Sequence, residues 1–297
     1  MTFVVVVGRL VFVVAVAVVV AAATMVGPRR LAETRRSFRA RFAAIRPYVG
    51  LLAVVLVANK IARDVGPEIS ELFGIRITGW LRRTDGRLLW PLYPENTPQV
   101  VAWVQSMATP ELTAYFSLVY VYGYVFLLVF PLVAYVSLPR PEPIRRTLIA
   151  YGANYLIGVL CYVVFVAYGP RNVIAEQVQG LLFTEYTHYQ FVTAAVNDET
   201  NVFPSLHTSM AVTAALLAWS TREEYPAWVP IAAALAVSVA VSTVYLGIHW
   251  ATDVLFGVVL GWVSVAIGRR FEGAPPTLEG FRDRLGAAGN LIPGRLR

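Results

Sequence analysis

The stretch YLGIHWATD, residues 245–253, stands at the entrance of a long apolar run. A second stretch, NVFPSLHTS at 201–209, opens another apolar run in the same way. Each carries one of the chain's three histidines, His249 and His207. An ionisable side chain beside membrane-length apolar sequence is costly unless it has a partner or a function. Asp253, four residues after His249, provides such a partner on the same face of a helix.

The composition of the whole chain indicates a polytopic membrane protein. Hydrophobic residues make up 57% of the 297 residues and charged residues 14%, and the mean hydropathy is +0.61, which is too apolar for a soluble domain of this size. Runs of roughly 20 apolar residues can cross the hydrocarbon core of a bilayer. Seven such runs predict transmembrane helices: 2–26, 47–63, 113–136, 147–168, 204–220, 228–247 and 251–268. We therefore expect an all-α integral membrane fold.

The distribution of arginine predicts the topology. The first run ends in small residues, as a cleaved signal peptide does, but seven arginines follow it, which favours an anchor with its N-terminus outside. The loops at 137–146 and 221–227 and the C-terminal tail are then cytoplasmic, together with 17 of the 25 lysines and arginines. Topology and anionic lipid headgroups thus account for the net charge of +7, and no nucleic-acid partner is expected.

This topology divides the chain into three parts. Residues 1–46 form a transmembrane anchor and a basic cytoplasmic loop, residues 47–270 a polytopic catalytic membrane domain, and residues 271–297 a cytoplasmic tail. The outer segment 64–112 mixes charges with tryptophan and tyrosine, and glycine and proline interrupt it from 66–67 onward. We expect this segment to form short amphipathic pieces at the membrane interface.

The two histidine stretches converge on one side of the membrane. The helices that begin near His207 and His249 both run from outside to inside, so their N-termini face the same side. Each N-terminus offers unpaired backbone N–H groups and the positive end of a helix dipole, which suit a phosphate. Ser205 adds a hydroxyl donor, and Arg171, at the outer end of the fourth run, can bind two phosphate oxygens.

The spacing of the polar residues assigns catalytic roles. A carboxylate on one imidazole nitrogen fixes the tautomer and makes the other nitrogen a better nucleophile. We therefore predict that His249, held by Asp253, attacks phosphorus to form a phosphohistidine. His207, on another helix, is the expected general acid that protonates the leaving oxygen. Water or a second alcohol then takes the phosphoryl group.

Metal and cofactor chemistry is not expected. The outer helix ends carry no carboxylate cluster suited to magnesium, and the only cysteine, Cys161, lies inside the fourth run. His188, in an outer loop, is expected to be a packing residue. A haem protein or a transporter is the non-enzymatic alternative. Paired haem ligands sit within facing spans, whereas His207 and His249 stand at helix entrances, and transporters place ionisable groups near the midplane.

FPSLH at 203–207 and YLGIHWATD at 245–253 resemble the motifs of the type 2 phosphatidic acid phosphatase superfamily, a group of integral membrane lipid phosphatases. The resemblance covers the last six apolar runs. It implies a six-helix core whose active site lies at helix ends facing one side, and a phosphohistidine mechanism without metal. The first run is then one additional N-terminal transmembrane helix.

The resemblance also implies residue roles. It makes His249 the nucleophile, Asp253 its partner and His207 the acid, while Ser205 and Gly247 help to hold the phosphate.

Two departures from the family pattern concern cationic phosphate ligands. The first motif normally has a lysine and then Arg-Pro, but YGPR at 168–171 has only Arg171, after the proline. The third motif normally begins Ser-Arg, whereas this chain has Ser242 and Thr243. In this respect the chain is similar to the branch containing fungal inositol phosphorylceramide synthases, which transfer a head group to a lipid alcohol.

The leading hypothesis is therefore a phosphatase in the cell membrane that acts on a lipid phosphate or polyprenyl diphosphate at the outer face. The alternative is a phosphotransferase that uses the same phosphohistidine with a lipid alcohol as acceptor. The sequence specifies neither the lipid, the acceptor nor the oligomeric state.

Overall fold

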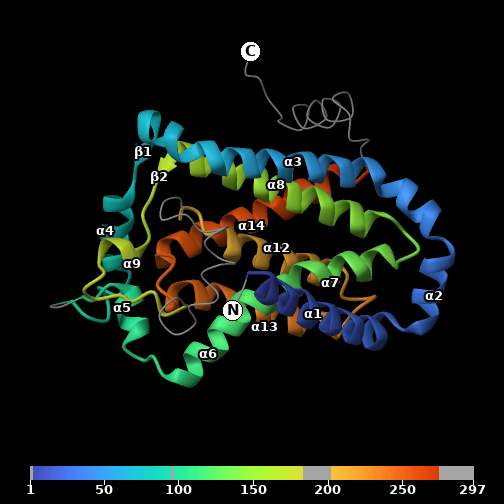
Figure 1. Ribbon diagram of the computed structural model, residues 1–297, viewed down its shortest axis with the longest axis horizontal. Helices are drawn as coiled ribbons and strands as arrows, with labels where there is room; N and C mark the ends of the chain where they lie inside the picture. Colours follow the sequence, from blue (N-terminus) through green and yellow to red (C-terminus); the bar gives the residue numbers. More distant parts are fainter. Residues whose placement is uncertain (1–2, 95–96, 183–201, 274–297) are drawn as a thin grey trace, which may run out of the picture.

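The computed structural model describes residues 3–94, 97–182 and 202–273, which form a bundle of long helices (Figure 1). Within these residues, six helical stretches are long and apolar enough to cross a membrane: Val4–Val26, Phe38–Gly66, Pro110–Val136, Glu142–Val164, Trp228–Tyr245 and Ala251–Phe271. The helices that form them are α1 (Phe3–Ala21) with the π-helical segment η1 (Ala22–Val26), α3 (Phe38–Phe73), α6 (Pro110–Leu118) with the π-helical segment η2 (Val119–Gly123) and α7 (Tyr124–Val136), α8 (Glu142–Val164), α13 (Trp228–Tyr245) and α14 (Ala251–Phe271). The chain is a multi-pass, all-α membrane protein, and the predicted fold class is confirmed.

The fifth predicted span, 204–220, is a shorter helix at the centre of the bundle. Helix α12 (Leu206–Ser220) has 15 residues, so it is about 22 Å long, against about 30 Å for the hydrocarbon core. It contacts α7, α8, α13 and α14, which surround it (Figure 1). Its N-cap, Ser205, is fully buried. The entrance to α12 therefore lies inside the bundle.

Glycine lets α14 approach α12 closely. A Cβ atom on Gly257 would lie 2.7 Å from the carbonyl oxygen of Ser205, and one on Gly261 would lie 2.7 Å from the carbonyl oxygen of Ser209. Small residues at a helix interface in a membrane allow such contact between backbones. The Oγ of Ser209 also donates to Oδ1 of Asn154 on α8 at 2.8 Å, inside the bundle. These contacts set the position of α12, which carries His207, relative to α14, which carries Asp253 and follows His249.

We expect Gly261→Ala to lower the free energy of unfolding by about 1–3 kcal/mol, because the added methyl group forces α12 and α14 apart. Thermal unfolding in detergent measures this change. Gly8→Ala in α1 is the matched control, since a Cβ there meets nothing within 4 Å. Equal stability of the two variants would contradict the close packing.

One end of the bundle carries short elements between the long helices (Figure 1). Strand β1 (Ile75–Arg76) pairs in parallel with β2 (Phe165–Val166). Helices α4 (Thr78–Leu88), α5 (Val100–Gln105) and α9 (Pro170–Val173) lie at the same end.

The break expected at 66–67 is wrong, because α3 continues for 36 residues from Phe38 to Phe73. Helix α3 packs along α8, and Gly66 lies near Val163, where an added Cβ would be 3.6 Å from a methyl group of the valine. Tertiary packing thus outweighs the local preference of glycine and proline to end a helix.

The opposite end carries arginines that bind backbone carbonyls of neighbouring helices. Helix α2 (Pro28–Arg36) leads into α3 there. Arg41 donates to the carbonyl of Val136, at the end of α7, at 3.0 Å, and Arg145 donates to the carbonyl of Ala44 at 3.2 Å. Arginines that the sequence places in the cytoplasm therefore also stabilise this end of the bundle.

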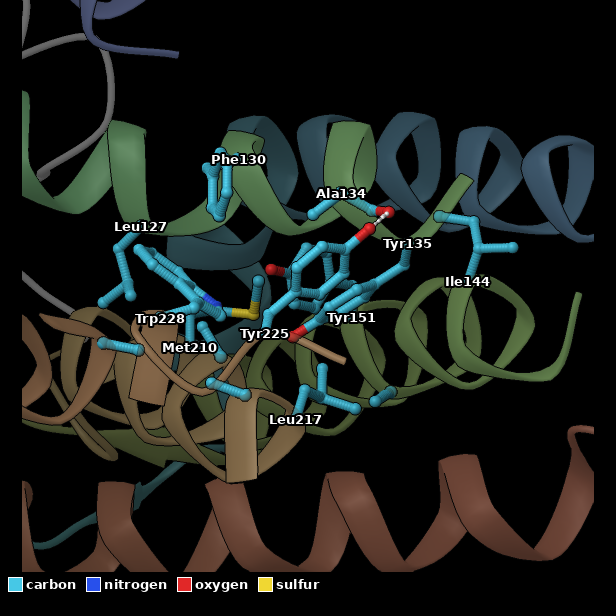
Figure 2. Packing of buried hydrophobic residues seen from close by; sticks show 14 of the residues in the cluster. Leu127, Phe130, Ala134, Tyr135, Ile144, Tyr151, Met210, Leu217, Tyr225 and Trp228 are labelled. Carbon is cyan, nitrogen blue, oxygen red and sulfur yellow. Dashed lines mark hydrogen bonds between the residues drawn. The ribbon is translucent and has the colours of Figure 1, made fainter. Parts of the chain in front are cut away.

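The hydrophobic core between α7, α12 and α13 is rich in aromatic rings (Figure 2). Trp228 packs edge-on against Phe130 with ring centroids 4.6 Å apart, and both side chains are fully buried. The hydroxyl of Tyr225 donates to the carbonyl of Ala134 at 2.8 Å, which satisfies its polar end (Figure 2). This core holds α7 and α13 against α12.

Candidate functional site

His249 and Asp253 form a buried pair at the start of α14. Their side chains are 4% and 0% exposed, and the distance from His249 Nδ1 to Asp253 Oδ2 is 3.6 Å. The helix begins only at Ala251, so His249 lies in the preceding turn, where its N–H donates to the carbonyl of Thr243 at 3.0 Å. Among the described residues, neither His249 Nδ1 nor Asp253 Oδ1 has a hydrogen-bond partner. The 3.6 Å between His249 Nδ1 and Asp253 Oδ2 is longer than a hydrogen bond, and a small closing movement would let the two atoms share a proton.

Ser205 joins the start of α12 to this pair. Its backbone N–H donates to the carbonyl of Asp253 at 3.1 Å. Its Oγ accepts from the N–H of Thr208 at 3.4 Å and donates to Oγ1 of the same residue at 3.0 Å. Ser205 is thus the N-cap of α12 and a direct backbone contact of α14.

His207 lies two residues further, in the first turn of α12, against two tyrosine rings. Its ring centroid is 4.4 Å from that of Tyr120, with 20° between the planes, and 4.4 Å from that of Tyr124, with 40°. The two rings, from η2 and α7, hold the imidazole of His207 by stacking. Tyr120 belongs to η2, and π-helical turns are frequent at functional sites.

Gly247 and Arg171 meet through the backbone. Gly247 has a φ of +73°, and a Cβ there would lie 2.5 Å from the carbonyl oxygen of Gln179. Its own carbonyl accepts from the N–H of Arg171 at 3.3 Å. Only glycine fits this turn between α13 and His249 without strain.

Gln105 is a residue of the site region that the sequence analysis missed. Its Nε2 donates to the carbonyls of Gln179 and Tyr245 at 2.8 and 2.9 Å, and its Oε1 accepts from the N–H of Gln179 at 2.9 Å. One side chain of α5 therefore holds the turn that contains Gly247. A glutamine in a single sequence carries no signal for such a role.

The start of α14 is occupied by carboxylates and is not an open site for an anion. Asp253 Oδ2 accepts from the N–H of Trp250 at 3.0 Å. Oδ1 of Asp85, on α4, accepts from the N–H of Ala251 at 2.7 Å. The expectation that this N-terminus offers unpaired N–H groups to a phosphate is therefore wrong for α14. The sequence analysis missed Asp85, whose only signal is an acidic residue in an arginine-rich amphipathic segment.

In the part of the chain that the structure describes, no group of three or more histidine, cysteine, aspartate or glutamate side chains could hold a metal ion. His188, expected to be a packing residue, lies outside the described residues.

Comparisons with known proteins identify a family for most of the membrane region. The family model described as the PAP2 superfamily matches residues 97–267, which include both histidine stretches. Among curated proteins, none matches the chain. Among solved structures, LpxE of Aquifex aeolicus is similar, with 20% sequence identity and a TM-score of 0.45 over 58% of this chain and 93% of that chain.

Proposed function

Because the chain belongs to the PAP2 superfamily, which supports a membrane lipid phosphatase in general terms, we propose that it hydrolyses a lipid phosphate or polyprenyl diphosphate through a phosphohistidine. The observation that carries this proposal is the buried pair of His249 and Asp253, 3.6 Å apart. The backbone of Asp253 also binds Ser205, the N-cap of the helix that presents His207. A nucleophile, its orienting carboxylate and a candidate acid are thereby carried on two helices in close contact.

The proposed reaction has two steps. In the first, Nε2 of His249 attacks phosphorus, the bond between phosphorus and the leaving oxygen breaks, and His207 gives its proton to that oxygen. Asp253 stabilises the positive charge that develops on the imidazole of His249. In the second, His207 takes a proton from water, whose oxygen attacks phosphorus while the N–P bond breaks. Inorganic phosphate leaves, and both histidines regain their first states.

The phosphate is proposed to bind Arg171, Ser205 and the turn at Gly247. The backbone N–H of Arg171 donates to the carbonyl of Gly247. The backbone of Arg171 therefore lies beside the turn that precedes His249. With α14 capped by carboxylates, we assign the cationic share of phosphate binding to the arginine.

The site is proposed to face the outside of the cell membrane. The arginine-rich loops lie at the end of the bundle opposite α4, α5 and α9, and positively charged loops stay in the cytoplasm (Figure 1). A substrate phosphate would then approach from the extracytoplasmic leaflet.

Product analysis tests the reaction class. We expect purified protein, given phospholipid with a labelled phosphate, to release labelled inorganic phosphate, also in the presence of EDTA. Transfer of the label to a second lipid would instead support the phosphotransferase. By resemblance, that alternative is favoured by the absence of the first-motif lysine near 168–171 and by Thr243 in place of the third-motif arginine. Loss of activity in EDTA with recovery in magnesium would contradict the metal-free mechanism.

A further inference from the structure

Asp85 is a fully buried carboxylate that faces the first turn of α14 from outside the catalytic helices. Its Oδ1 accepts from Ala251 N–H at 2.7 Å, and its Oδ2 accepts from Val100 N–H, at the start of α5, at 3.0 Å. The amide of Trp250, next to that of Ala251, is bound by Asp253. Two carboxylates from different helices thus share the capping of one turn.

Burial of the charged carboxylate of Asp85 costs free energy of desolvation. Burial raises the pKa of Asp85 to about 6, although hydrogen bonds from the backbone of Ala251, Val100 and Thr252 lower it, and the charge of Asp253 raises it further. A neutral serine or asparagine would cap a helix without this penalty. A carboxylate, however, offers two acceptor oxygens, one for the N–H of Ala251 at α14 and one for the N–H of Val100 at α5.

No cation of α4 or α5 offsets that cost. The arginines of α4, at 82, 83 and 87, are exposed to solvent, and α5 has no charged side chain. The negative charge of Asp85 faces the positive end of the α14 dipole and, beside it, Asp253.

Helix α4 is fixed against the catalytic helices, so the position of Asp85 is well defined. Trp80 packs edge-on against Phe203 and Phe256, with ring centroids 6.4 and 6.0 Å away. The Oγ1 of Thr78 accepts from the N–H of Tyr168 at 3.1 Å. Strand β1, just before α4, pairs with β2, which follows α8. The outer segment is a docked element that reaches the start of α14.

We propose that Asp85 is a positioning residue that keeps Asp253 aligned with His249. The proposal rests on the proposed function of that pair. Because Asp85 takes the N–H of Ala251, Asp253 has to cap only Trp250 and stays 3.6 Å from Nδ1 of His249. Without Asp85, the Ala251 N–H competes for the Asp253 carboxylate and draws it away from the imidazole.

Asp85→Asn tests this role, because an amide has one acceptor oxygen for two N–H donors. We expect kcat to fall about tenfold with KM within about twofold, as for loss of alignment rather than of substrate binding. In an Asp253→Asn background, Asp85→Asn should have no further effect on kcat. Asp64→Asn, which removes an exposed carboxylate, is the matched control and should leave kcat unchanged. An unchanged kcat in Asp85→Asn, or an equal loss in both backgrounds, would overturn the proposal.

A second variant tests the same role if Asp85→Asn does not fold. Ala251→Pro deletes the N–H that Asp85 binds at the first position of α14, where proline is tolerated, and Trp250 already has the extended ψ of 150° that precedes proline. Because no Ala251 N–H then remains to compete for Asp253, we expect Ala251→Pro to keep kcat near the wild-type value and to restore kcat when it is combined with Asp85→Asn. A double variant as slow as Asp85→Asn alone would overturn the proposal.

A spectroscopic readout separates this proposal from the proposed function. With three histidines in the chain, ¹⁵N-histidine NMR can assign the His249 signals by their loss in His249→Ala. We expect protonated Nδ1 in the wild type and a mixture of tautomers in Asp85→Asn. An unchanged tautomer in Asp85→Asn would contradict the positioning role, whatever the activity. A changed tautomer, in a protein whose wild type shows no phosphatase activity, would contradict only the proposed function.

Discussion

His249→Ala is expected to lower turnover by about 10⁴-fold or more, to background, while the protein remains folded. Loss of a nucleophile removes the covalent route itself and leaves only the contribution of binding to the rate. The same change should abolish the covalent label that wild-type protein acquires from labelled substrate in a rapid acid-free quench. An N–P bond survives base and breaks in acid, which distinguishes phosphohistidine from a phosphate ester. Turnover that survives in His249→Ala would remove the nucleophile assignment.

His207→Ala provides the matched comparison on the other helix. A general acid contributes typically about 10²–10⁴-fold, and its contribution shrinks when the leaving group needs no proton. We therefore expect an aryl phosphate with a good leaving group to restore formation of the label in His207→Ala but not in His249→Ala. Equal rescue of both variants would contradict the separate roles of the two histidines.

Asp253→Asn is expected to lower kcat by about 10²–10⁴-fold with little change in stability. Asparagine Oδ1 can still accept the N–H of Trp250, so the cap of α14 is preserved. The oxygen that accepts this N–H is also the one nearest Nδ1 of His249, at 3.6 Å, so the variant keeps an oxygen beside the imidazole but loses the negative charge that stabilises the imidazolium.

The measurements are steady-state kinetics and thermal unfolding in the same detergent. Asp64→Asn again controls for the loss of one carboxylate, because that side chain is 58% exposed and pairs only with Lys60 among the described ion pairs. Near-wild-type kcat in Asp253→Asn would show that His249 does not depend on this carboxylate. A large loss of stability would assign Asp253 a structural role instead.

The sequence predicts much of the centre because its chemistry is local. His249 and Asp253 are only four residues apart, and this short separation keeps their side chains near one another although the helix begins at Ala251. The all-α membrane class follows equally directly from apolar runs of membrane length. Both the fold class and the family resemblance are confirmed, and the roles of the individual site residues stay predictions.

The errors concern contacts between distant segments. A glycine and proline pair at 66–67 predicts a helix end, but packing along α8 carries α3 to Phe73. Open amides at the start of α14 follow from helix geometry, but a carboxylate 166 residues earlier in the chain binds one of them.

By itself, the sequence determined that this chain is a membrane protein, which histidine has a carboxylate partner, and which family it belongs to. These properties depend on composition and on spacing within one helix turn. Only the tertiary structure decided that Ser205 binds the backbone of Asp253, that tyrosines of η2 and α7 contact His207, and that Asp85 caps α14. Each of these contacts joins segments far apart in the chain. Their geometry arises from close helix packing and from the need to pair every buried polar group, which no local pattern encodes.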